Sequence, residues 1–125
     1  VRVSDIQIAE LYDQSTFLEM VSLEDIGFSK RGEAWKNIAE CCKDFQGYYE
    51  ADGKKIFVNT DGGLKADGNP LGATGGAEIY EIVKQLNEEA GSRQVKAEAG
   101  LRHGCTLELE GFGTKVYVHI LRRGE

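Results

Sequence analysis

Hydrophobic and polar residues first alternate along the chain and then recur with the spacing of a helix. Ile6 and Ile8 stand between polar neighbours, a pattern that predicts a short strand within residues 5–12. Two helices are predicted after it, over residues 16–26 and 33–45, because apolar residues return there every three or four positions. The apolar positions of these two helices are Phe17, Leu18, Val21 and Leu23, and then Trp35, Ile38, Ala39 and Cys42.

Turn-forming residues separate these elements from the second half of the chain. Residues 13–15 offer an N-cap for the first helix, Gly27 offers it a stop, and residues 46–55 carry turn chemistry. A short β-prone run over residues 55–59 predicts a strand, and a glycine-rich loop follows it over residues 61–76.

The last third of the chain predicts one helix and a β-hairpin. The helix covers residues 77–90, and strands over 105–109 and 115–121 are joined by a turn at 110–113. This order of strands and helices favours an α/β fold, a mixed sheet with helices packed on it, within one domain spanning residues 1–125. The apolar face of the helix is formed by Ile79, Ile82, Val83 and Leu86.

The net charge, the apolar runs and the cysteine pattern argue against several classes of function. The 125 residues carry a net charge of −6 and no basic stripe, which argues against a nucleic-acid partner. We expect no membrane span, because no apolar run approaches the ~20 residues that one requires. The three cysteines match no zinc spacing, so we expect free thiols, no metal site and a cytoplasmic location. The chain begins with Val1 and carries no signal-peptide pattern, so we expect a processed protein or a piece of a longer one.

The glycine-rich stretch before the clearest helix is the most specific feature. Residues 59–75 read NTDGGLKADGNPLGATG. Glycines permit a positive φ and a close approach of backbone amides to a ligand, and a helix start adds unpaired N–H groups suited to an oxyanion or a thioester carbonyl. The alternative interpretation is a tight loop that only turns a strand into a helix.

This stretch closely resembles the Gly-Gly…Gly-His-Pro-(hydrophobic)-Gly-Ala-(Thr/Ser)-Gly signature of the C-terminal half of thiolases. The nearest branch holds archaeal thiolases and the sterol-carrier-protein, or lipid-transfer, type. Residues 5–27 and 103–121 extend the resemblance, and residues 31–55 follow it more loosely. The resemblance implies a thiolase-like half, a five-stranded mixed sheet with helices on its faces. It also implies a coenzyme A thioester as substrate or ligand, no further cofactor, and substrate-binding residues at Gly68, Gly72, Ala73, Thr74 and Gly75.

Several positions depart from the thiolase pattern. Asn69 stands where the family has the histidine of Gly-His-Pro, and an amide cannot take a proton from a thiol. The family's His-Asp-Cys-Phe block becomes Tyr12-Asp13-Gln14-Ser15, so that Gln14 replaces an acid/base cysteine and Tyr12 replaces a histidine. Tyr12 is interpreted either as a hydrogen-bond or proton donor or as a half-buried aromatic residue at a strand end.

The closing motif keeps the family histidine as His103 but replaces the neighbouring asparagine with Gly104. Cys105 invites comparison with the acid/base cysteine of biosynthetic thiolases, whereas its place in an alternating strand favours a small buried thiol. His119 alternates with Tyr117 in the last strand and is interpreted as structural.

The resemblance implies that the nucleophilic cysteine belongs to an N-terminal thiolase half, in the same chain or in another. The leading hypothesis is a C-terminal half that contributes an acyl-CoA thioester pocket without Claisen chemistry. Thiolase-like aldolases cleave β-hydroxyacyl-CoA thioesters, and this reaction would use Tyr12 for proton transfer together with Asn69 and His103. The resemblance to these aldolases also implies a partner, a small zinc-ribbon/OB-fold subunit. The alternatives are a non-catalytic acyl-CoA or lipid-binding module, and a subunit of a divergent acetyl-CoA acyltransferase whose nucleophile lies on another chain.

Overall fold

The computed structural model describes residues 1–44, 48–51 and 53–124, without the side chains of residues 41–44, 48, 50 and 51. Four α-helices and five strands are formed within these ranges. In chain order they are β1 (Ile8–Leu11), α1 (Thr16–Asp25), α2 (Ala34–Asp44), β2 (Tyr48–Ala51), β3 (Lys54–Val58), α3 (Gly63–Asp67), α4 (Thr74–Leu86), β4 (His103–Glu110) and β5 (Lys115–Arg122). Short 3-10 turns lie at η1 (Val3–Asp5), η2 (Leu71–Ala73) and η3 (Gly91–Arg93).

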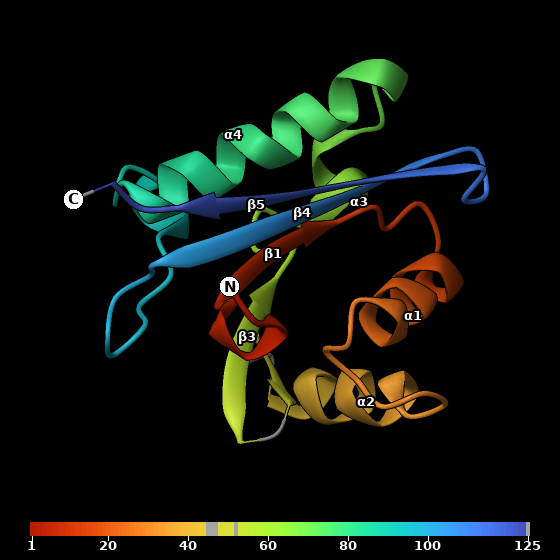
Figure 1. Cartoon of the computed structure of the whole chain (residues 1–125), viewed down its shortest axis with the longest axis horizontal. Helices are drawn as coiled ribbons and strands as arrows, with labels where there is room; N and C mark the ends of the chain where they lie inside the picture. Colours follow the sequence, from red (N-terminus) through yellow and green to blue (C-terminus); the bar gives the residue numbers. More distant parts are fainter. Residues whose placement is uncertain (45–47, 52, 125) are drawn as a thin grey trace.

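The strands form one mixed sheet in the order β2-β3-β1-β4-β5. β1 is parallel to both of its neighbours, β3 and β4, whereas β2 and β5 are antiparallel edge strands. Figure 1 shows α4 along one face of this sheet and α1 and α2 on the other. The predicted α/β fold, a mixed sheet with helices on its faces, is confirmed. No described helix is both long enough and apolar enough to cross a membrane.

The central strand β1 is buried on both faces, as a strand between two parallel neighbours is expected to be. Ile8 belongs to a hydrophobic cluster with Ile82 and Leu86 of α4. Leu11 points to the other face and joins a larger cluster that includes Leu23 of α1. The sheet therefore has a core on each side.

β4 alternates between these two cores. Cys105 belongs to the α1 and α2 side, whereas Gly104 faces α4. A Cβ atom at Gly104 would lie 2.6 Å from Cγ2 of Ile82 and 3.1 Å from Cγ2 of Ile8. The space that an asparagine side chain would need at this position is thus filled by the α4 core.

α4 buries a largely polar face. Glu78, Glu81 and Gln85 are buried together with Ile82 and Leu86, whereas Tyr80 is 61% exposed. Gln85 is held in place because its Nε2 donates to the backbone oxygen of Arg93 at 2.9 Å and its Oε1 accepts from the backbone N–H of Val95 at 2.9 Å. Glu81 forms an ion pair with Arg93 at 2.7 Å. These contacts replace part of the apolar packing that a helix normally supplies.

Several predicted elements are confirmed with shifted bounds. Ser15 caps α1 by accepting from the backbone N–H of Leu18 at 3.2 Å, and Gly27 follows that helix at φ 88°. The first strand is shorter than residues 5–12, since a 3-10 turn occupies its beginning. The main helix begins at Thr74, three residues earlier than expected. Both hairpin strands and the turn between them are confirmed.

Other expectations about local structure are wrong. The stretch predicted as turns contains β2, and the stretch predicted as a glycine-rich loop contains α3. Some predicted core positions are exposed, among them Phe17, Ala39, Val83 and Trp35, the last at 58%. The core contacts of α1 and α2 are instead made by Leu18 of α1 and by Ala34 and Ile38 of α2. The predictions made for the Cys42 side chain, Phe45 and Asp52 lie outside the described residues.

Gly63 is a position where only glycine fits. Its φ is 62°, and a Cβ atom there would lie 2.1 Å from Oδ2 of Asp13. This close approach lets Oδ1 of Asp13 accept from the backbone N–H of Leu64 at 2.8 Å. The contact ties the end of β1 to the start of α3.

Gly63→Ala is therefore expected to lower the free energy of unfolding by about 1–3 kcal/mol, because it combines a strained φ with a clash at Asp13. Gly76→Ala is the matched control, since Gly76 lies in α4 with open space around its Cα. That variant should be unchanged or more stable by up to about 1 kcal/mol. Urea unfolding of the two variants checks both values, and equal stabilities would contradict this account of Gly63.

Glu10 is a buried acid in the middle of the sheet, with only 2% of its surface exposed. Burial, followed by the nearby charge of Asp61, raises the pKa of Glu10 to about 10. The folded protein therefore holds a proton on Glu10 that the unfolded chain releases above its ordinary pKa of 4.5.

Because the folded state binds the extra proton, this contribution to stability is complete below about pH 4.5 and is lost as the pH rises toward about 10. The free energy of unfolding should fall with pH across this window. Glu10→Gln should reduce the slope by up to about 1.4 kcal/mol per pH unit. Urea unfolding at a series of pH values measures the slope, and an unchanged slope in the variant would show that Glu10 is ionised in the folded protein.

Candidate functional site

A groove of about 470 Å³ lies at the edge of the sheet where the parallel strands β1 and β4 end. Ligands of open α/β sheets bind outside the carboxyl ends of the strands, which makes this groove the candidate site. It is lined by Tyr12, Leu71, Gly72, Gly75, Glu108, Leu109, Glu110, Gly111, Tyr117 and His119.

Tyr12 and Asn69, two predicted catalytic residues, are in contact. Oδ1 of Asn69 accepts from the backbone N–H of Leu71 at 3.1 Å and from Oγ1 of Thr74 at 2.8 Å. A backbone N–H can only donate, so Oδ1 must face Leu71 and Nδ2 must face Tyr12. Nδ2 donates to Oη of Tyr12 at 2.9 Å. Tyr12 accepts that hydrogen bond and keeps its own proton for another partner.

Two side chains that follow β3 hold the glycine-rich stretch in place. Asn59 pairs with the last residue of β1, since its Oδ1 accepts from the N–H of Leu11 at 2.7 Å and its Nδ2 donates to the oxygen of Leu11 at 3.1 Å. Oδ1 of Asp61 then accepts from the N–H of Gly63 at 2.8 Å. The stretch is thus fixed next to Tyr12 before α4 begins.

The five predicted substrate-binding residues take different positions. Gly72 and Gly75 line the groove. Thr74 is buried and holds Asn69 instead of facing the groove. Gly68 and Ala73 are exposed and lie outside the groove lining. Their predicted roles in binding stay predictions.

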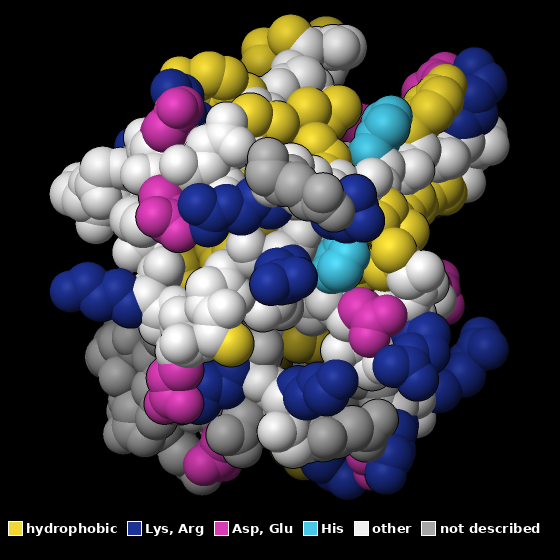
Figure 2. Space-filling view, turned by 60° about the vertical axis from the view of Figure 1, so that its left-hand side comes forward, with side chains coloured by type: hydrophobic (Ala, Val, Ile, Leu, Met, Phe, Trp, Pro, Cys, Tyr) yellow, Lys and Arg dark blue, Asp and Glu magenta, His cyan; other side chains and the backbone are white. Residues whose placement is uncertain are grey.

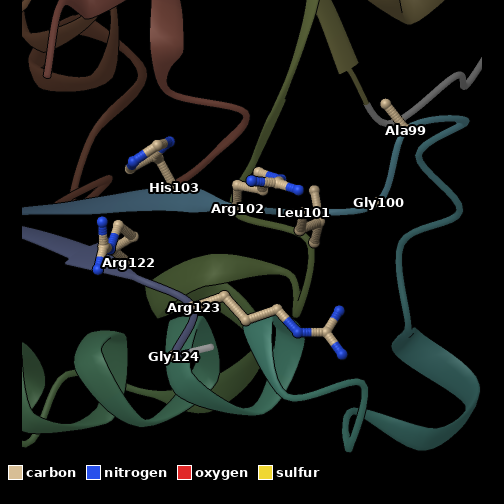
Figure 3. A pocket seen from close by; sticks show the side chains of 8 residues that line it. All are labelled: Ala99, Gly100, Leu101, Arg102, His103, Arg122, Arg123 and Gly124. Atoms are coloured by element: carbon tan, nitrogen blue, oxygen red, sulfur yellow. The ribbon is translucent and has the colours of Figure 1, made fainter.

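His103 lies at the opposite end of β4 from the groove. Its backbone N–H donates to Oε1 of Gln7 at 3.3 Å, close to where β1 begins. Its side chain lines a second groove of about 390 Å³ together with Arg102, Arg122 and Arg123. Figure 3 shows the side chains of His103 and Arg122 next to each other and that of Arg123 pointing away from them. The structure does not bring His103 together with Tyr12, and its catalytic role stays a prediction.

Two carboxyl groups beside the first groove were not singled out in the sequence. Glu108 of β4 lines the groove, and Glu78 of α4 lies behind it. Burial and then the charge of Glu108 raise the pKa of Glu78 to about 9, and burial raises the pKa of Glu108. The sequence carries no signal for either residue, because Glu108 alternates with the apolar Leu107 and Leu109 and Glu78 lies outside the apolar face predicted for its helix.

Tyr117 and His119 of β5 also line the groove. They stand opposite Glu108 and Thr106 in the sheet, and Nδ1 of His119 lies 3.2 Å from Oγ1 of Thr106. His119, interpreted from the sequence as structural, thus forms part of the groove lining.

Cys105 is a buried thiol on the other face of β4. Burial, followed by the charges of Glu78 and Glu10, raises its pKa to about 12, which keeps the thiol protonated. No cysteine is found among the described residues that line the groove. Within the described ranges, no set of three histidine, cysteine or acidic side chains is arranged to hold a metal ion.

Comparison of the sequence with known proteins shows the family of this chain. Residues 1–123 match the family model described as thiolase C-terminal domain-like. The chain is 41% identical over 119 residues to an acetyl-CoA acetyltransferase of Methanothermobacter thermautotrophicus, covering 95% of this chain and 28% of that protein. It is 35% identical over 125 residues to an acetyl-CoA acetyltransferase of Methanocaldococcus jannaschii, covering 97% and 30%.

Sterol carrier protein 2 of Bos taurus is 34% identical over 125 residues, which cover 99% of this chain and 21% of that protein. The chain thus spans less than a third of the length of each of these three relatives. Both branches of the predicted resemblance, the archaeal one and the sterol-carrier-protein one, are confirmed. Because the match covers nearly every residue, the chain belongs to the thiolase C-terminal domain-like family.

Proposed function

We propose that this chain forms one wall of an acyl-CoA thioester site that an N-terminal thiolase half completes. Family membership supports this proposal, because a thiolase C-terminal domain implies an N-terminal half elsewhere. Two relatives are named acetyl-CoA acetyltransferases, and this chain corresponds to 28% and 30% of their lengths. The groove beside Tyr12 is open to solvent, so a second wall could cover it.

Within this site we propose carbon–carbon bond cleavage by proton transfer, a retro-aldol reaction on a β-hydroxyacyl-CoA thioester. Such cleavage needs a base for the substrate hydroxyl and a hydrogen-bond donor for the thioester enolate, and it needs no nucleophilic thiol. The observation that carries the proposal is the hydrogen bond from Asn69 to Tyr12. This bond uses the amide N–H of the residue at the thiolase histidine position, and because Tyr12 accepts it, the phenol proton stays available for a ligand in the groove.

The same hydrogen bonds argue against thiolase chemistry in this groove. Asn69 cannot act as a base, and its two polar atoms already have partners in Tyr12, Leu71 and Thr74. Gln14, at the position of the acid/base cysteine, is exposed and absent from the groove lining. A divergent acyltransferase with its nucleophile on another chain would lack the histidine and the cysteine of the thiolase pattern, because Asn69 and Gln14 replace them.

The outer surfaces of α4 and β5 supply the proposed contact with the N-terminal half. Tyr80 and Val83 of α4 are exposed on one side of the sheet. Val116, Val118 and Ile120 of β5 are exposed on the other, because they pair with Leu109, Leu107 and Cys105. In Figure 2, hydrophobic side chains gather in the upper half of the face, at the height where Figure 1 draws α4 and β5. Exposed apolar surface of this kind marks a protein–protein contact.

A second candidate is a module that binds acyl-CoA or a lipid without converting it. The aliphatic side chains of Leu71 and Leu109 favour this reading, since they provide apolar walls to the groove. Sterol carrier protein 2 of Bos taurus is a relative whose name refers to transport rather than to catalysis. A small zinc-ribbon/OB-fold subunit remains a proposed companion only for the aldolase.

Tyr12→Phe tests the proposed chemistry in the protein assembled with its N-terminal half. Without the phenol proton, kcat for cleavage of β-hydroxyacyl-CoA thioesters should fall about 100-fold or more, whereas the Kd for the thioester should change less than about threefold. Release of the shortened acyl-CoA and of the carbonyl product is followed by chromatography. Tyr49→Phe is the control, because the hydroxyl of Tyr49 donates to Glu19 on the α1 side of the sheet.

Equal kcat in Tyr12→Phe and the unaltered protein would remove Tyr12 from the mechanism. Saturable thioester binding with no turnover by the assembled protein would favour the binding module instead.

Tyr80→Glu tests the proposed contact surface. Placing a charge there should weaken association with the N-terminal half at least about 10-fold, because the carboxylate would have to be buried without a partner. Trp35→Glu is a matched control, an aromatic residue on a helix that is 58% exposed, compared with 61% for Tyr80. The Kd between separate halves measures the effect, or the urea midpoint if one polypeptide carries both. Equal effects of the two substitutions would place the contact elsewhere.

A further inference from the structure

Two carboxyl groups meet behind the wall of the groove. Glu108 projects from the α4 side of β4 beside Gly75, where a Cβ atom would lie 3.4 Å from Cγ of Glu108. Glu78 lies one helical turn after Thr74 and is only 6% exposed. The two side chains are within hydrogen-bonding reach of each other. One member of the pair therefore contacts the groove and the other is enclosed by protein.

These carboxyl groups have no hydrogen-bond donor among the described residues. Both oxygen atoms of Glu78 and Oε2 of Glu108 are buried without a partner. Arg93, a basic residue of η3 that contacts the buried side of α4, is already paired with Glu81. A bare carboxylate in such a place loses its hydration and gains no hydrogen bond in return.

The surroundings of the pair are acidic or neutral on every side that packs against it. Asp13 follows β1 and Asp61 precedes α3, and the charge of each disfavours ionisation of Glu78. On β5, Tyr117 stands opposite Glu108, and His119 stands opposite Thr106, to which it is hydrogen-bonded. A single proton held between Glu78 and Glu108 would give each carboxyl group a hydrogen-bond partner and leave one negative charge instead of two.

We propose that Glu78 and Glu108 share one proton and that Glu108 is the base that accepts the substrate's hydroxyl proton in the groove. This inference rests on the retro-aldol function proposed above. Glu108 is the catalytic member because it lines the groove with Tyr12. Glu78 is a positioning residue, since it reaches the substrate only through Glu108 and keeps the shared proton in place.

The protons and electrons balance without any further reactant. Glu108 takes the proton of the β-hydroxyl group, the Cα–Cβ bond breaks, and its electron pair becomes the thioester enolate while the β-carbon becomes a carbonyl. Tyr12 gives its proton to Cα of the enolate and forms the shortened acyl-CoA. The proton gained by the carboxyl pair then returns to the Tyr12 oxygen through solvent, which restores both groups.

Carbon-13 NMR of the protein labelled at the glutamate side-chain carboxyl carbon tests the shared proton directly. The assembled protein is titrated with pH, and Glu78→Gln and Glu108→Gln assign the two resonances. At neutral pH the pair should show one proton, lost only near pH 9, the value to which burial and Glu108 raise the pKa of Glu78. Two carboxyl groups that both titrate near the ordinary value of 4.5 would overturn the proposal. Either variant identifies its own resonance by difference, so one folded variant suffices, and Glu10→Gln separates the signal of Glu10, whose pKa burial also raises.

Kinetics test the role of the pair in turnover. Glu108→Gln should lower kcat about 100-fold or more at every pH with KM changed less than about threefold. Glu78→Gln should keep most of kcat near neutral pH and lose the alkaline limb near pH 9 from the pH–rate profile. Glu98→Gln, an exposed acid after α4, is the control and should leave kcat and its pH profile unchanged.

The outcomes separate this inference from the proposed function. A pair that holds a proton, together with unchanged kcat in Glu108→Gln, would overturn the catalytic role of Glu108 and leave the retro-aldol proposal standing. Absence of turnover in the unaltered protein would overturn both, and the NMR titration would still show whether the two groups share a proton.

Discussion

The structure depends on the attachment of the glycine-rich stretch to the end of β1. Asp13 accepts from the backbone of Leu64 at 2.8 Å, and Asn69 donates to Tyr12 at 2.9 Å, across sequence separations of 51 and 57 residues. These two bonds hold α3 and the residues after it against the end of β1. They thereby place the start of α4 beside the groove that Tyr12 lines.

The second organising feature is an acidic interior on the α4 side of the sheet. Glu10 of β1 and Glu78 of α4 are buried there, and burial raises the pKa of each far above that of an exposed acid. Glu81 differs because Arg93 neutralises it. Burying acids in this way lowers the stability of the fold but leaves carboxyl groups that hold a proton at neutral pH. Such groups cluster at functional sites. Of these acids, Glu78 lies beside Glu108 and the groove, and the proposed role concerns this pair and not Glu10.

The sequence predicts the elements better than it predicts their buried faces. The hairpin and the three longer helices, α1, α2 and α4, follow from local patterns, and the resemblance to thiolases pointed to Tyr12 and Asn69. β2 (Tyr48–Ala51) was missed because turn residues surround it and its pairing is with β3. The polar face of α4 was missed because Gln85 is buried through bonds to the η3 region that no helical period reveals. Glu108 became a site residue only when the pairing of β4 placed it beside the groove.

The arrangement of α4 links the proposed assembly to the proton on the carboxyl pair. Tyr80 on its outer side is 61% exposed, whereas Glu78 on its inner side is 6% exposed. An N-terminal half that covers Tyr80 and closes the groove would remove the remaining water from Glu108. Burial already raises the pKa of Glu108, and further loss of water disfavours its charged form more strongly. Completion of the site by an N-terminal half would thereby make Glu108 a stronger base.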